Sequence, residues 1–321
     1  MKRLGLLLLF LAATVSYYLF TPHSIAHAPI GFTLEQGSLK HAAKEMREAG
    51  VIGNPLPFVW LARIMGKASM IKAGNYELVR SVTPLELLEK ITEGDYSMSK
   101  FMLVEGTTFG ELRRQLDANP DLTHDTLNLA DGQILSDLDI PASSPEGLFF
   151  PDTYYFAKGQ SDLSILKRAH RMMQKKLLSA WQRRGPDLPF KDIYSALTLA
   201  SIVEKETGRD ADRAMVAAVF INRLKLGMKL QTDPAVIYGL GNQFDGNLRK
   251  HDLLADQPYN TYTRSGLPPT PISMPGIKSI NAVLHPAQTH ALYFVARGDG
   301  SSVFSNSLAE HNRAVNRYQK K

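Results

Sequence analysis

The segment that most constrains the fold runs from Leu197 to Gly208, where an acidic residue, Glu204, stands near the end of an otherwise apolar, small-residue stretch. Such a stretch predicts a helix with Asp192 as its N-cap and Gly208 as its C-cap. A carboxylate in the last turn faces the negative end of the helix dipole, and partial burial also disfavours its charged form. A carboxyl group that keeps its proton at neutral pH suits a general acid, so Glu204 is a candidate catalytic residue.

Two carboxylates in this segment compete for that role. Glu204 and Glu206 are two residues apart, so on a helix they point to nearly opposite sides and cannot serve one site. Glu204 shares its stripe with Ala200 and Ser201, which suits the wall of a cleft. Glu206 can pair with Arg209 three residues later and stay ionised. We therefore favour Glu204, although the segment alone is equally compatible with a surface ion-pair cluster at a helix end.

The chain is moderately basic. Its 321 residues include 37 Lys and Arg against 31 Asp and Glu, which gives a formal net charge of +6. A basic surface suits an anionic partner such as membrane headgroups, an acidic polymer or nucleic acid. Because no recognition helix or RNA-binding signature accompanies the scattered cations, we expect no nucleic-acid partner.

Several chemistries are excluded by missing residues and motifs. The chain has no cysteine, which removes disulfides, thiolate zinc sites and cysteine nucleophiles. It also lacks a Gly-x-Ser-x-Gly elbow, a phosphate-binding P-loop, a dinucleotide fingerprint and a His-Glu-x-x-His zinc motif. We therefore expect no cofactor and no metal.

The N-terminus has the pattern of a membrane anchor. Two basic residues precede an apolar run from Leu4 to Phe20, which is near the shortest length that spans a bilayer. This pattern predicts that residues 1–3 are cytoplasmic, that residues 4–22 form a transmembrane anchor and that the rest is exported. The alternative is a cleaved signal peptide, because Ala26-His-Ala28 resembles a cleavage site, but a proline follows it.

The rest of the sequence predicts an α+β protein in two parts. After a linker over residues 23–30, residues 31–98 form a small α+β module and residues 99–321 a larger mixed α/β domain. Periodicity and capping residues predict helices over residues 39–49, 57–65, 84–92, 109–117, 163–184, 192–207, 210–226 and 307–318. A strand–turn–strand pattern over residues 291–305 predicts a hairpin. Between residues 228 and 276 the many Gly and Pro residues predict ordered binding loops.

Seven ordered motifs resemble those of one family. They are the segments Pro145–Phe156, Ala200–Glu206, Val219–Leu224, Leu230–Gly239, Tyr259–Tyr262, Gly266–Ile272 and His285-Pro286. Together they resemble the endolytic murein transglycosylases of the YceG-like family, over essentially the whole chain. One departure is Thr270, where many relatives carry glycine.

The resemblance implies a bitopic inner-membrane enzyme, with a LysM-like module over residues 31–98 and a YceG-like catalytic domain over residues 99–321 in the periplasm. Such enzymes cut nascent peptidoglycan strands internally between N-acetylmuramic acid (MurNAc) and N-acetylglucosamine (GlcNAc). They leave 1,6-anhydroMurNAc ends and are expected to terminate glycan elongation. The family's catalytic glutamate falls on Glu204. A strand cutter at the membrane would also meet peptidoglycan synthases.

This chemistry agrees with a single acid. Ordinary glycosidases need two carboxylates. In a lytic transglycosylase Glu204 would protonate the glycosidic oxygen and then take the proton of the sugar's own 6-hydroxyl group, which attacks the anomeric carbon with a high effective molarity. If a second carboxylate is needed, Asp233 is the best candidate, and otherwise it is a helix or turn cap before Pro234.

Polar and aromatic residues of the motifs offer groups for sugar binding. The candidates are Gln231, Asn222, Asp233, Tyr238, Asn260, Tyr262 and Tyr154, with Tyr155 as a further ring for stacking. For each polar residue alone, a structural hydrogen bond is an equally good explanation.

Two other functions remain open from the sequence. A muramidase that uses water would leave reducing ends instead of anhydro ends. A membrane-tethered scaffold that binds peptidoglycan without cutting it would not need the carboxyl group of Glu204 at all.

Overall fold

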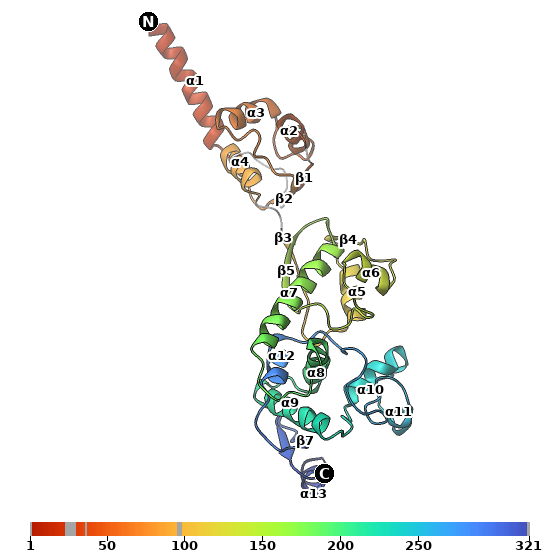
Figure 1. The fold of residues 1–321 in the computed structure, drawn as a ribbon. Helices are drawn as coiled ribbons and strands as arrows, with labels where there is room; N and C mark the ends of the chain where they lie inside the picture. The colour runs from red at the N-terminus through yellow and green to blue at the C-terminus, as the bar shows by residue number, and fades with distance from the viewer. Residues whose placement is uncertain (1, 23–29, 36, 95–97, 320–321) are drawn as a thin grey trace. The chain divides into compact units, whose positions relative to one another are not determined.

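The computed structural model describes residues 2–22, 30–35, 37–94 and 98–319 (Figure 1). Within these residues the chain forms thirteen α-helices and four two-stranded sheets, which confirms the predicted α+β class. It divides into two compact units, one made of residues 1–100 and 155–160 and the other of residues 101–154 and 161–321. The predicted linker over residues 23–30 lies almost entirely outside the described residues.

The first helix, α1 (Lys2–Phe20), covers the apolar run near the N-terminus. Among the described residues, no helix is both long enough and apolar enough to cross a membrane. The transmembrane anchor predicted over residues 4–22 is therefore not supported. The last turn of α1 is instead used for packing, because Tyr18 and Leu19 are half-buried there and Leu19 contacts the core of the first unit.

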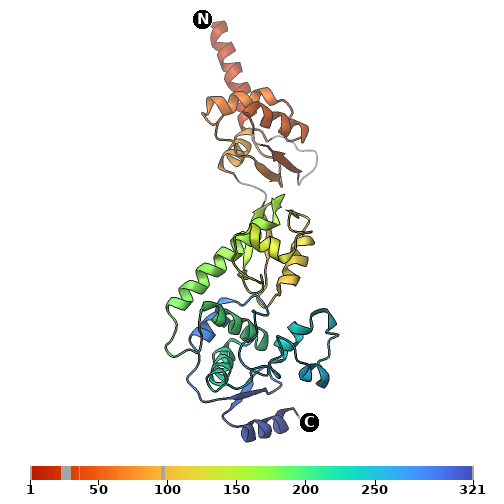
Figure 2. The ribbon, with the colours of Figure 1, turned by 45° about the vertical axis from the view of Figure 1, so that its right-hand side comes forward.

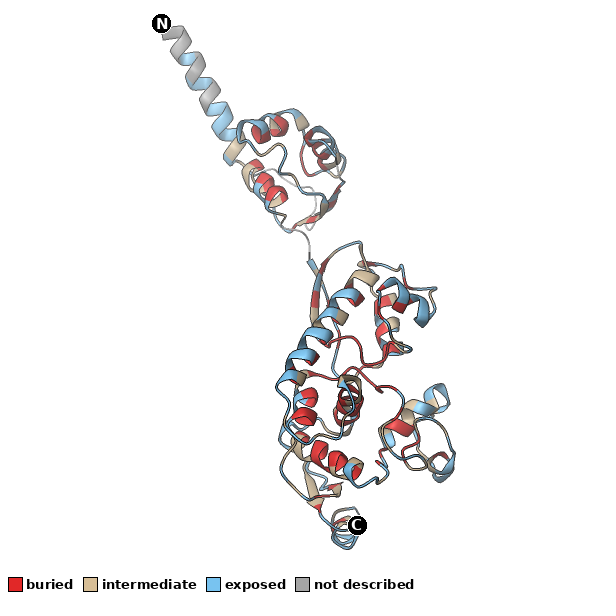
Figure 3. Ribbon diagram, in the orientation of Figure 1, coloured by how far each residue is buried: buried red, intermediate tan, exposed pale blue. Residues whose placement is uncertain are grey.

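The first unit builds its core between a small sheet and helices. Its elements after α1 are β1 (Ile30–Leu34), α2 (Leu39–Glu48), α3 (Pro55–Ile64), β2 (Gly74–Leu78) and α4 (Pro84–Glu93). The strands β1 and β2 pair antiparallel, with Phe32 opposite Tyr76. The helices begin at side-chain caps, namely Ser38, Asn54 and Thr83. The apolar side chains of their buried faces form one cluster. Figure 3 colours the buried residues of these elements red.

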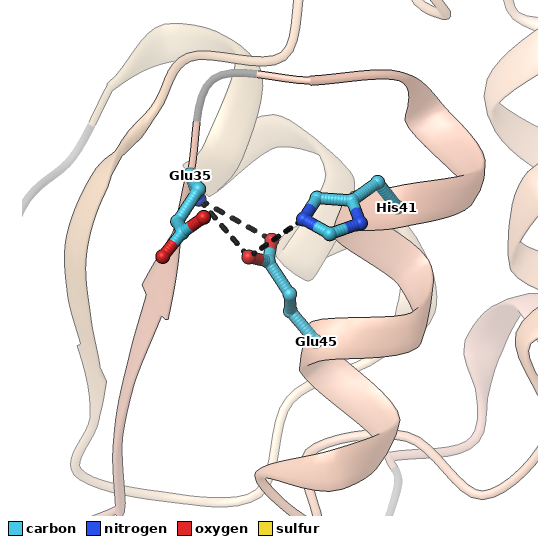
Figure 4. A group of neighbouring side chains, drawn as sticks. All are labelled: Glu35, His41 and Glu45. Carbon is cyan, nitrogen blue, oxygen red and sulfur yellow. Dashed lines mark hydrogen bonds and ion pairs between the residues drawn. The ribbon is translucent and has the colours of Figure 1, made fainter.

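The carboxylate of Glu45 binds the backbone of the segment that joins β1 to α2 (Figure 4). Both oxygens of Glu45 accept the backbone N–H of Glu35 at 3.3 Å, and Oε1 lies 3.3 Å from Nε2 of His41. Glu45 therefore holds the end of β1 against the second turn of α2. These contacts give Glu35, His41 and Glu45 a structural role.

The chain from residue 98 to residue 182 forms two short sheets and three helices. Its elements are β3 (Met98–Met102), α5 (Phe109–Asp117), β4 (Leu122–Thr123), α6 (Asp131–Asp137), β5 (Thr153–Ala157), β6 (Gln160–Ser161) and α7 (Asp162–Gln182). β3 pairs with β5, and β4 pairs with β6. The bounds of α5 and α7 agree with the predicted ones to within two residues, because both helices have strong caps and clear apolar faces.

Three helices form the centre of the second unit. They are α8 (Ile193–Glu206), α9 (Asp210–Lys225) and α12 (Ile277–Leu284), and α12 packs against both of the others (Figures 1 and 2). Every residue of α8 from Ala196 to Val203 is buried. The small-residue stretch of the sequence is thus a central helix, and its polar end reaches the edge of the core.

The Gly- and Pro-rich region contains more helix than the sequence predicts. It holds α10 (Asp233–Leu240), the short 3₁₀ helix η1 (Gly241–Gln243) and α11 (Lys250–Leu254). α10 and α11 lie to one side of α8 and α9 (Figures 1 and 2). Pro234 does not prevent the helix, because proline fits the first turn, where no backbone N–H is needed. The prediction of loops throughout this region is therefore wrong for these segments.

The C-terminal region follows the predicted pattern. β7 (Tyr293–Ala296) and β8 (Ser302–Ser305) form the antiparallel hairpin, and α13 (Leu308–Tyr318) begins after Ser307. The hydroxyl of Ser307 accepts the backbone N–H of Glu310, which explains why the helix starts there.

Candidate active site

Glu204 lies in the last turn of α8, as the sequence predicts. Asp192 is the N-cap and accepts the backbone N–H of Ser195 at 2.7 Å. The helix ends at Thr207, which has extended backbone angles, so the C-cap is not Gly208. The buried residues from Ala196 to Val203 fix the rotation of the helix about its axis. This rotation sets the direction in which the Glu204 side chain points.

The carboxylate of Glu204 is held by two donors. Nη1 of Arg213 lies 3.0 Å from Oε1, and the backbone N–H of Gly276 donates to Oε2 at 2.8 Å. The side chains of Glu204 and Arg213 are each only 6% exposed. Charge-assisted bonds of this kind are stronger than neutral ones. Each oxygen of the carboxylate therefore has a donor of its own, which the sequence does not predict.

Arg213 is itself fixed by groups from two helices. It donates to Oγ of Ser279 on α12 at 2.5 Å, and Nη2 lies 3.3 Å from the carboxylate of Asp210 on α9. Asp210 also pairs with Lys278. The guanidinium group of Arg213 is thus held by Ser279 and Asp210 in the position from which it donates to Glu204.

The loop that carries Gly276 is tied to α8. Oγ of Ser201 accepts the backbone N–H of Ile272 at 2.9 Å, and Oγ of Ser273 donates to the carbonyl of Ser201. Ser201 and Ser273 are fully buried. These bonds set the distance between the loop and the helix, and so they place the N–H of Gly276 at Glu204.

A second carboxylate, which the sequence did not single out, lies at this site. Glu105 follows β3 in a turn that is bound to the same loop: Gly106 donates to the carbonyl of Met274, and Met274 donates to the carbonyl of Thr107, both at 2.8 Å. A Cβ atom at Gly276 would collide with the Glu105 carboxyl group. Desolvation and then the charge of Glu204 raise the pKa of Glu105. The sequence predicts the helix over residues 109–117 that follows this turn, but it gives no sign of where Glu105 lies.

Glu206 points to different surroundings, as the two-residue spacing predicts. It does not pair with Arg209 in the structure. Its carboxyl group instead accepts the hydroxyl of Thr232, and burial raises its pKa despite that hydrogen bond. The predicted ion pair fails because the side chain turns inward toward a cavity of about 470 Å³.

Three of the predicted sugar-binding residues line the same cavity as Glu206. They are Gln231, Asp233 and Tyr262. The hydroxyl of Tyr262 donates to Asp233 at 2.6 Å, and Gln231 is exposed with a φ of 51°. Asp233 thus has a partner other than Glu204, and the carboxylate found beside Glu204 is Glu105.

Three other predicted contacts are structural. Nδ2 of Asn260 donates to three backbone carbonyls between residues 252 and 255, and the residue is fully buried. Nδ2 of Asn222 donates to the carbonyls of Thr289 and Ala291. Tyr154 is 4% exposed, and its hydroxyl donates to the carbonyl of Phe150. These hydrogen bonds give each group a structural role, and sugar binding by these residues stays a prediction.

Tyr238 belongs to a buried polar pair. Its hydroxyl donates to Glu146 at 3.1 Å, and Glu146 also accepts the backbone N–H of Phe109 at the start of α5. Burial raises the pKa of Glu146 to about 7, against hydrogen bonds that favour its charged form. Tyr238 therefore helps to connect α10 to α5.

The described residues contain two groups with the ligand types of a metal site. One is the Glu35–His41–Glu45 cluster of the first unit, and the other is Asp117, His124 and Asp162. Asp162 already accepts three hydrogen bonds, from Asp125 and Thr126. Neither group includes Glu204, and the absence of a metal from the reaction stays a prediction.

Comparison with known proteins identifies the family. The model of the YceG-like family matches residues 32–317, which is most of the chain. The chain belongs to the YceG-like family. A crystal structure of a YceG-like protein from Listeria monocytogenes matches with a TM-score of 0.55 and 29% identity, and covers 89% of this chain and 98% of that one.

Two curated relatives with similar sequences are named endolytic murein transglycosylase. The endolytic murein transglycosylase of Bacillus subtilis (strain 168) is 40% identical over 173 residues, 54% of this chain and 48% of the relative. That of Streptococcus pneumoniae serotype 2 is 25% identical over 315 residues, 88% of this chain and 56% of the relative. This YceG-like chain therefore spans about half the length of these relatives.

Proposed function

We propose that this YceG-like protein is an endolytic lytic transglycosylase that cuts MurNAc–GlcNAc bonds within peptidoglycan strands and leaves 1,6-anhydroMurNAc ends. The names of the two relatives support the substrate and the reaction class. The observation that carries the proposal is the fixed carboxylate of Glu204, bound by Arg213 and Gly276 at the edge of the core.

We assign the catalytic carboxyl group to Glu204. A carboxylate can accept about four hydrogen bonds, and the two described donors leave room for a sugar hydroxyl group. Glu204 would take the proton of the 6-hydroxyl group as its oxygen attacks the anomeric carbon of the same sugar. Because the nucleophile is part of the substrate, no water has to be positioned.

The first step needs a proton on the glycosidic oxygen. From the sequence alone, Glu204 supplies this proton and then recovers one from the 6-hydroxyl group. Arg213 and the backbone N–H of Gly276 each donate a hydrogen bond to this carboxyl group, so they hold it in one position relative to the core.

We place further sugar contacts in the cavity beside Glu206. Gln231, Asp233 and Tyr262 present amide, carboxylate and hydroxyl groups there, and such groups recognise acetamido and hydroxyl substituents. Tyr155 is 56% exposed and remains a candidate for stacking on a sugar in the first unit.

We also propose that the first unit is a LysM-like module that binds glycan. Its order of strand, two helices and antiparallel strand supports a compact carbohydrate-binding fold. The proposed substrate lies outside the cytoplasm, so we place the folded part in the periplasm at the inner membrane, near the peptidoglycan synthases whose product it would cut. Fractionation of cells tests the location.

A water-using muramidase is the second candidate, because Glu105 beside Glu204 supplies the carboxylate pair that glycosidases use. Uncrosslinked glycan strands incubated with the full chain distinguish the candidates when the new ends are identified by mass spectrometry. We expect internal cuts with 1,6-anhydroMurNAc ends. Reducing ends would indicate the muramidase, and strands that stay intact would favour the non-catalytic scaffold.

A further inference from the structure

The outer face of α3 in the first unit is apolar. Leu56, Trp60 and Ile64 follow one another at every fourth position, so their side chains lie on one face of the helix. They are 64%, 61% and 80% exposed. The opposite face of α3 is apolar too, and it packs in the core of the first unit. A helix that is apolar on both faces is usually covered on both. The outer face of α3 is therefore a candidate contact surface.

The exposed apolar side chains continue past the end of α3. Met65 and Met70 are 48% and 52% exposed. The backbone that carries them is held in place, because the N–H of Lys67 donates to the carbonyl of Ala62 at 2.9 Å and the N–H of Met70 donates to the carbonyl of Lys67 at 3.1 Å. Exposed apolar groups of this kind mark contacts with proteins or membranes. We use the name α3 surface for five residues: Leu56, Trp60, Ile64, Met65 and Met70.

The segment that holds the α3 surface carries only positive charge. From residue 49 to residue 76 the sequence has Arg63, Lys67 and Lys72 and neither Asp nor Glu. Arg63 is exposed and Lys67 is half-buried. The guanidinium carbon of Arg63 lies 5.9 Å from the ring centre of Trp60, so a cation adjoins the apolar face. Apolar side chains beside an indole and cations are the features with which a helix binds the surface of an anionic bilayer.

The N-terminal helix of the same unit also exposes apolar side chains. Leu6, Leu9 and Phe10 of α1 are 67%, 70% and 75% exposed, and Leu19 at the end of α1 contacts the core of the unit. A sugar is recognised by amide, hydroxyl and carboxylate groups, and the five side chains of the α3 surface carry none of these. A bilayer requires only apolar area and positive charge. Lipid therefore fits the α3 surface better than glycan does.

We propose that the α3 surface binds the headgroup region of an anionic lipid bilayer. Its apolar side chains enter the boundary between headgroups and acyl chains to a depth of about 5–10 Å, and Arg63 and Lys67 lie at the lipid phosphates. The first unit is then held on a membrane surface by its own fold, apart from any contact that α1 makes. This interaction does not depend on the proposed cleavage of glycan strands.

The fluorescence of tryptophan tests the proposal, because the sequence has two tryptophans, Trp60 and Trp181. Trp181→Phe leaves only the indole of the α3 surface, and Trp60→Phe is the matched control, which leaves only the indole of α7. Each full chain is mixed with vesicles of phosphatidylcholine and phosphatidylglycerol by removal of detergent, so the test does not require α1 to attach the chain. Lipids brominated in the acyl chains should lower the Trp60 emission about twofold or more at a depth of about 5–10 Å, and the Trp181 emission much less.

Variants of the apolar side chains test which residues make the contact. In the chain that keeps only Trp60, Leu56→Gln together with Ile64→Gln should remove the quenching, because two of the inserted side chains become polar. Both residues are exposed, so the fold should be unchanged, which circular dichroism checks. Leu178→Gln is the matched control: Leu178 is an exposed leucine of α7, and its replacement should leave the quenching as it is.

The charge of the bilayer gives a separate readout. Quenching of Trp60 should be stronger in vesicles that contain phosphatidylglycerol than in vesicles of phosphatidylcholine alone, because the cations are attracted to anionic headgroups. Arg63→Gln together with Lys67→Gln should remove this difference. The same quenching in both kinds of vesicle would contradict the proposed role of the two cations.

Several results would overturn the proposal as a whole. One is quenching of Trp60 no greater than that of Trp181, and another is quenching that persists in the Leu56→Gln, Ile64→Gln chain. If the Trp60 emission shifts with protein concentration without lipid, the surface binds a second copy of the chain instead. If glycan strands shift the emission and brominated lipid does not quench it, the surface binds sugar.

Discussion

Two carboxyl groups at the end of α8 lie two residues apart and have opposite surroundings. Glu204 faces a buried guanidinium group and a backbone N–H, and each of its oxygens binds one of them. Glu206 faces a hydroxyl group, a second carboxylate and a cavity, and burial raises its pKa. Helical rotation alone therefore gives neighbouring acids different surroundings: one lies in an ion pair, and the other has a raised pKa beside a cavity.

The largest effect is expected when the ion pair is broken. Arg213→Met leaves the buried Glu204 without its cation, so we expect the free energy of unfolding to fall by about 3–5 kcal/mol. Urea unfolding measures this change. Lys225→Met is the matched control: it removes a cation from a pair whose carboxylate is 88% exposed, and should cost less than about 1 kcal/mol. Equal losses in the two variants would contradict the structural role of Arg213.

A smaller loss is expected from Asn260→Ala. The amide of Asn260 donates to three carbonyls, so the variant leaves buried acceptors without a donor and should lower the free energy of unfolding by about 2 kcal/mol. Because Asn260 is fully buried, KM for glycan strands should stay unchanged. A higher KM at unchanged stability would support the sequence-based prediction that Asn260 binds sugar.

Glu206→Gln should change the pH dependence of stability. The raised pKa means that the folded chain holds the Glu206 proton more tightly than the unfolded chain, so this group makes stability fall as pH rises through the interval between the two pKa values. Glutamine carries no such proton. The variant should therefore gain stability relative to wild type above that interval and match it in acid, as thermal unfolding at several pH values would reveal. A constant difference at every pH would contradict the raised pKa of Glu206.

The smallest effect is expected from Tyr262→Phe, which tests whether the cavity beside Glu206 binds substrate without taking part in the chemical step. Tyr262→Phe removes the hydroxyl donor to Asp233 and one polar group from the cavity. We expect KM to rise by about fivefold or less, with kcat within twofold of wild type, because one neutral hydrogen bond contributes about 1 kcal/mol. Steady-state cleavage kinetics test this, and a large fall in kcat would place the cavity in the chemical step.

The parts of the fold that the sequence predicts are those set by local patterns. The caps at Asp192 and Ser307 place the starts of α8 and α13, and the strand–turn–strand pattern over residues 291–305 predicts the hairpin of β7 and β8. The opposite directions of Glu204 and Glu206 follow from helical geometry alone. These features need no knowledge of distant contacts.

The parts that the sequence misses depend on contacts between distant segments. Glu105 and Gly276 are far apart in the chain, and only the bonds between their loops bring them to Glu204. The amides of Asn222 and Asn260 looked available because a sequence does not reveal which backbone carbonyls will meet them. The short helices α10 and α11 are not predicted, because the many Gly and Pro residues of this region have low helix propensity. The stability of such helices depends more on packing than on helix propensity.

The most direct test of the account compares the two acids of α8 in one assay. Glu204→Gln and Glu206→Gln proteins, each a full chain that differs from wild type by one carboxyl group, are incubated with uncrosslinked glycan strands, and new 1,6-anhydroMurNAc ends are counted by mass spectrometry. We expect a ~10³-fold loss of new ends for Glu204→Gln and nearly wild-type cleavage for Glu206→Gln. Retained cleavage in Glu204→Gln, or its loss only in Glu206→Gln, would contradict the assignment of the site.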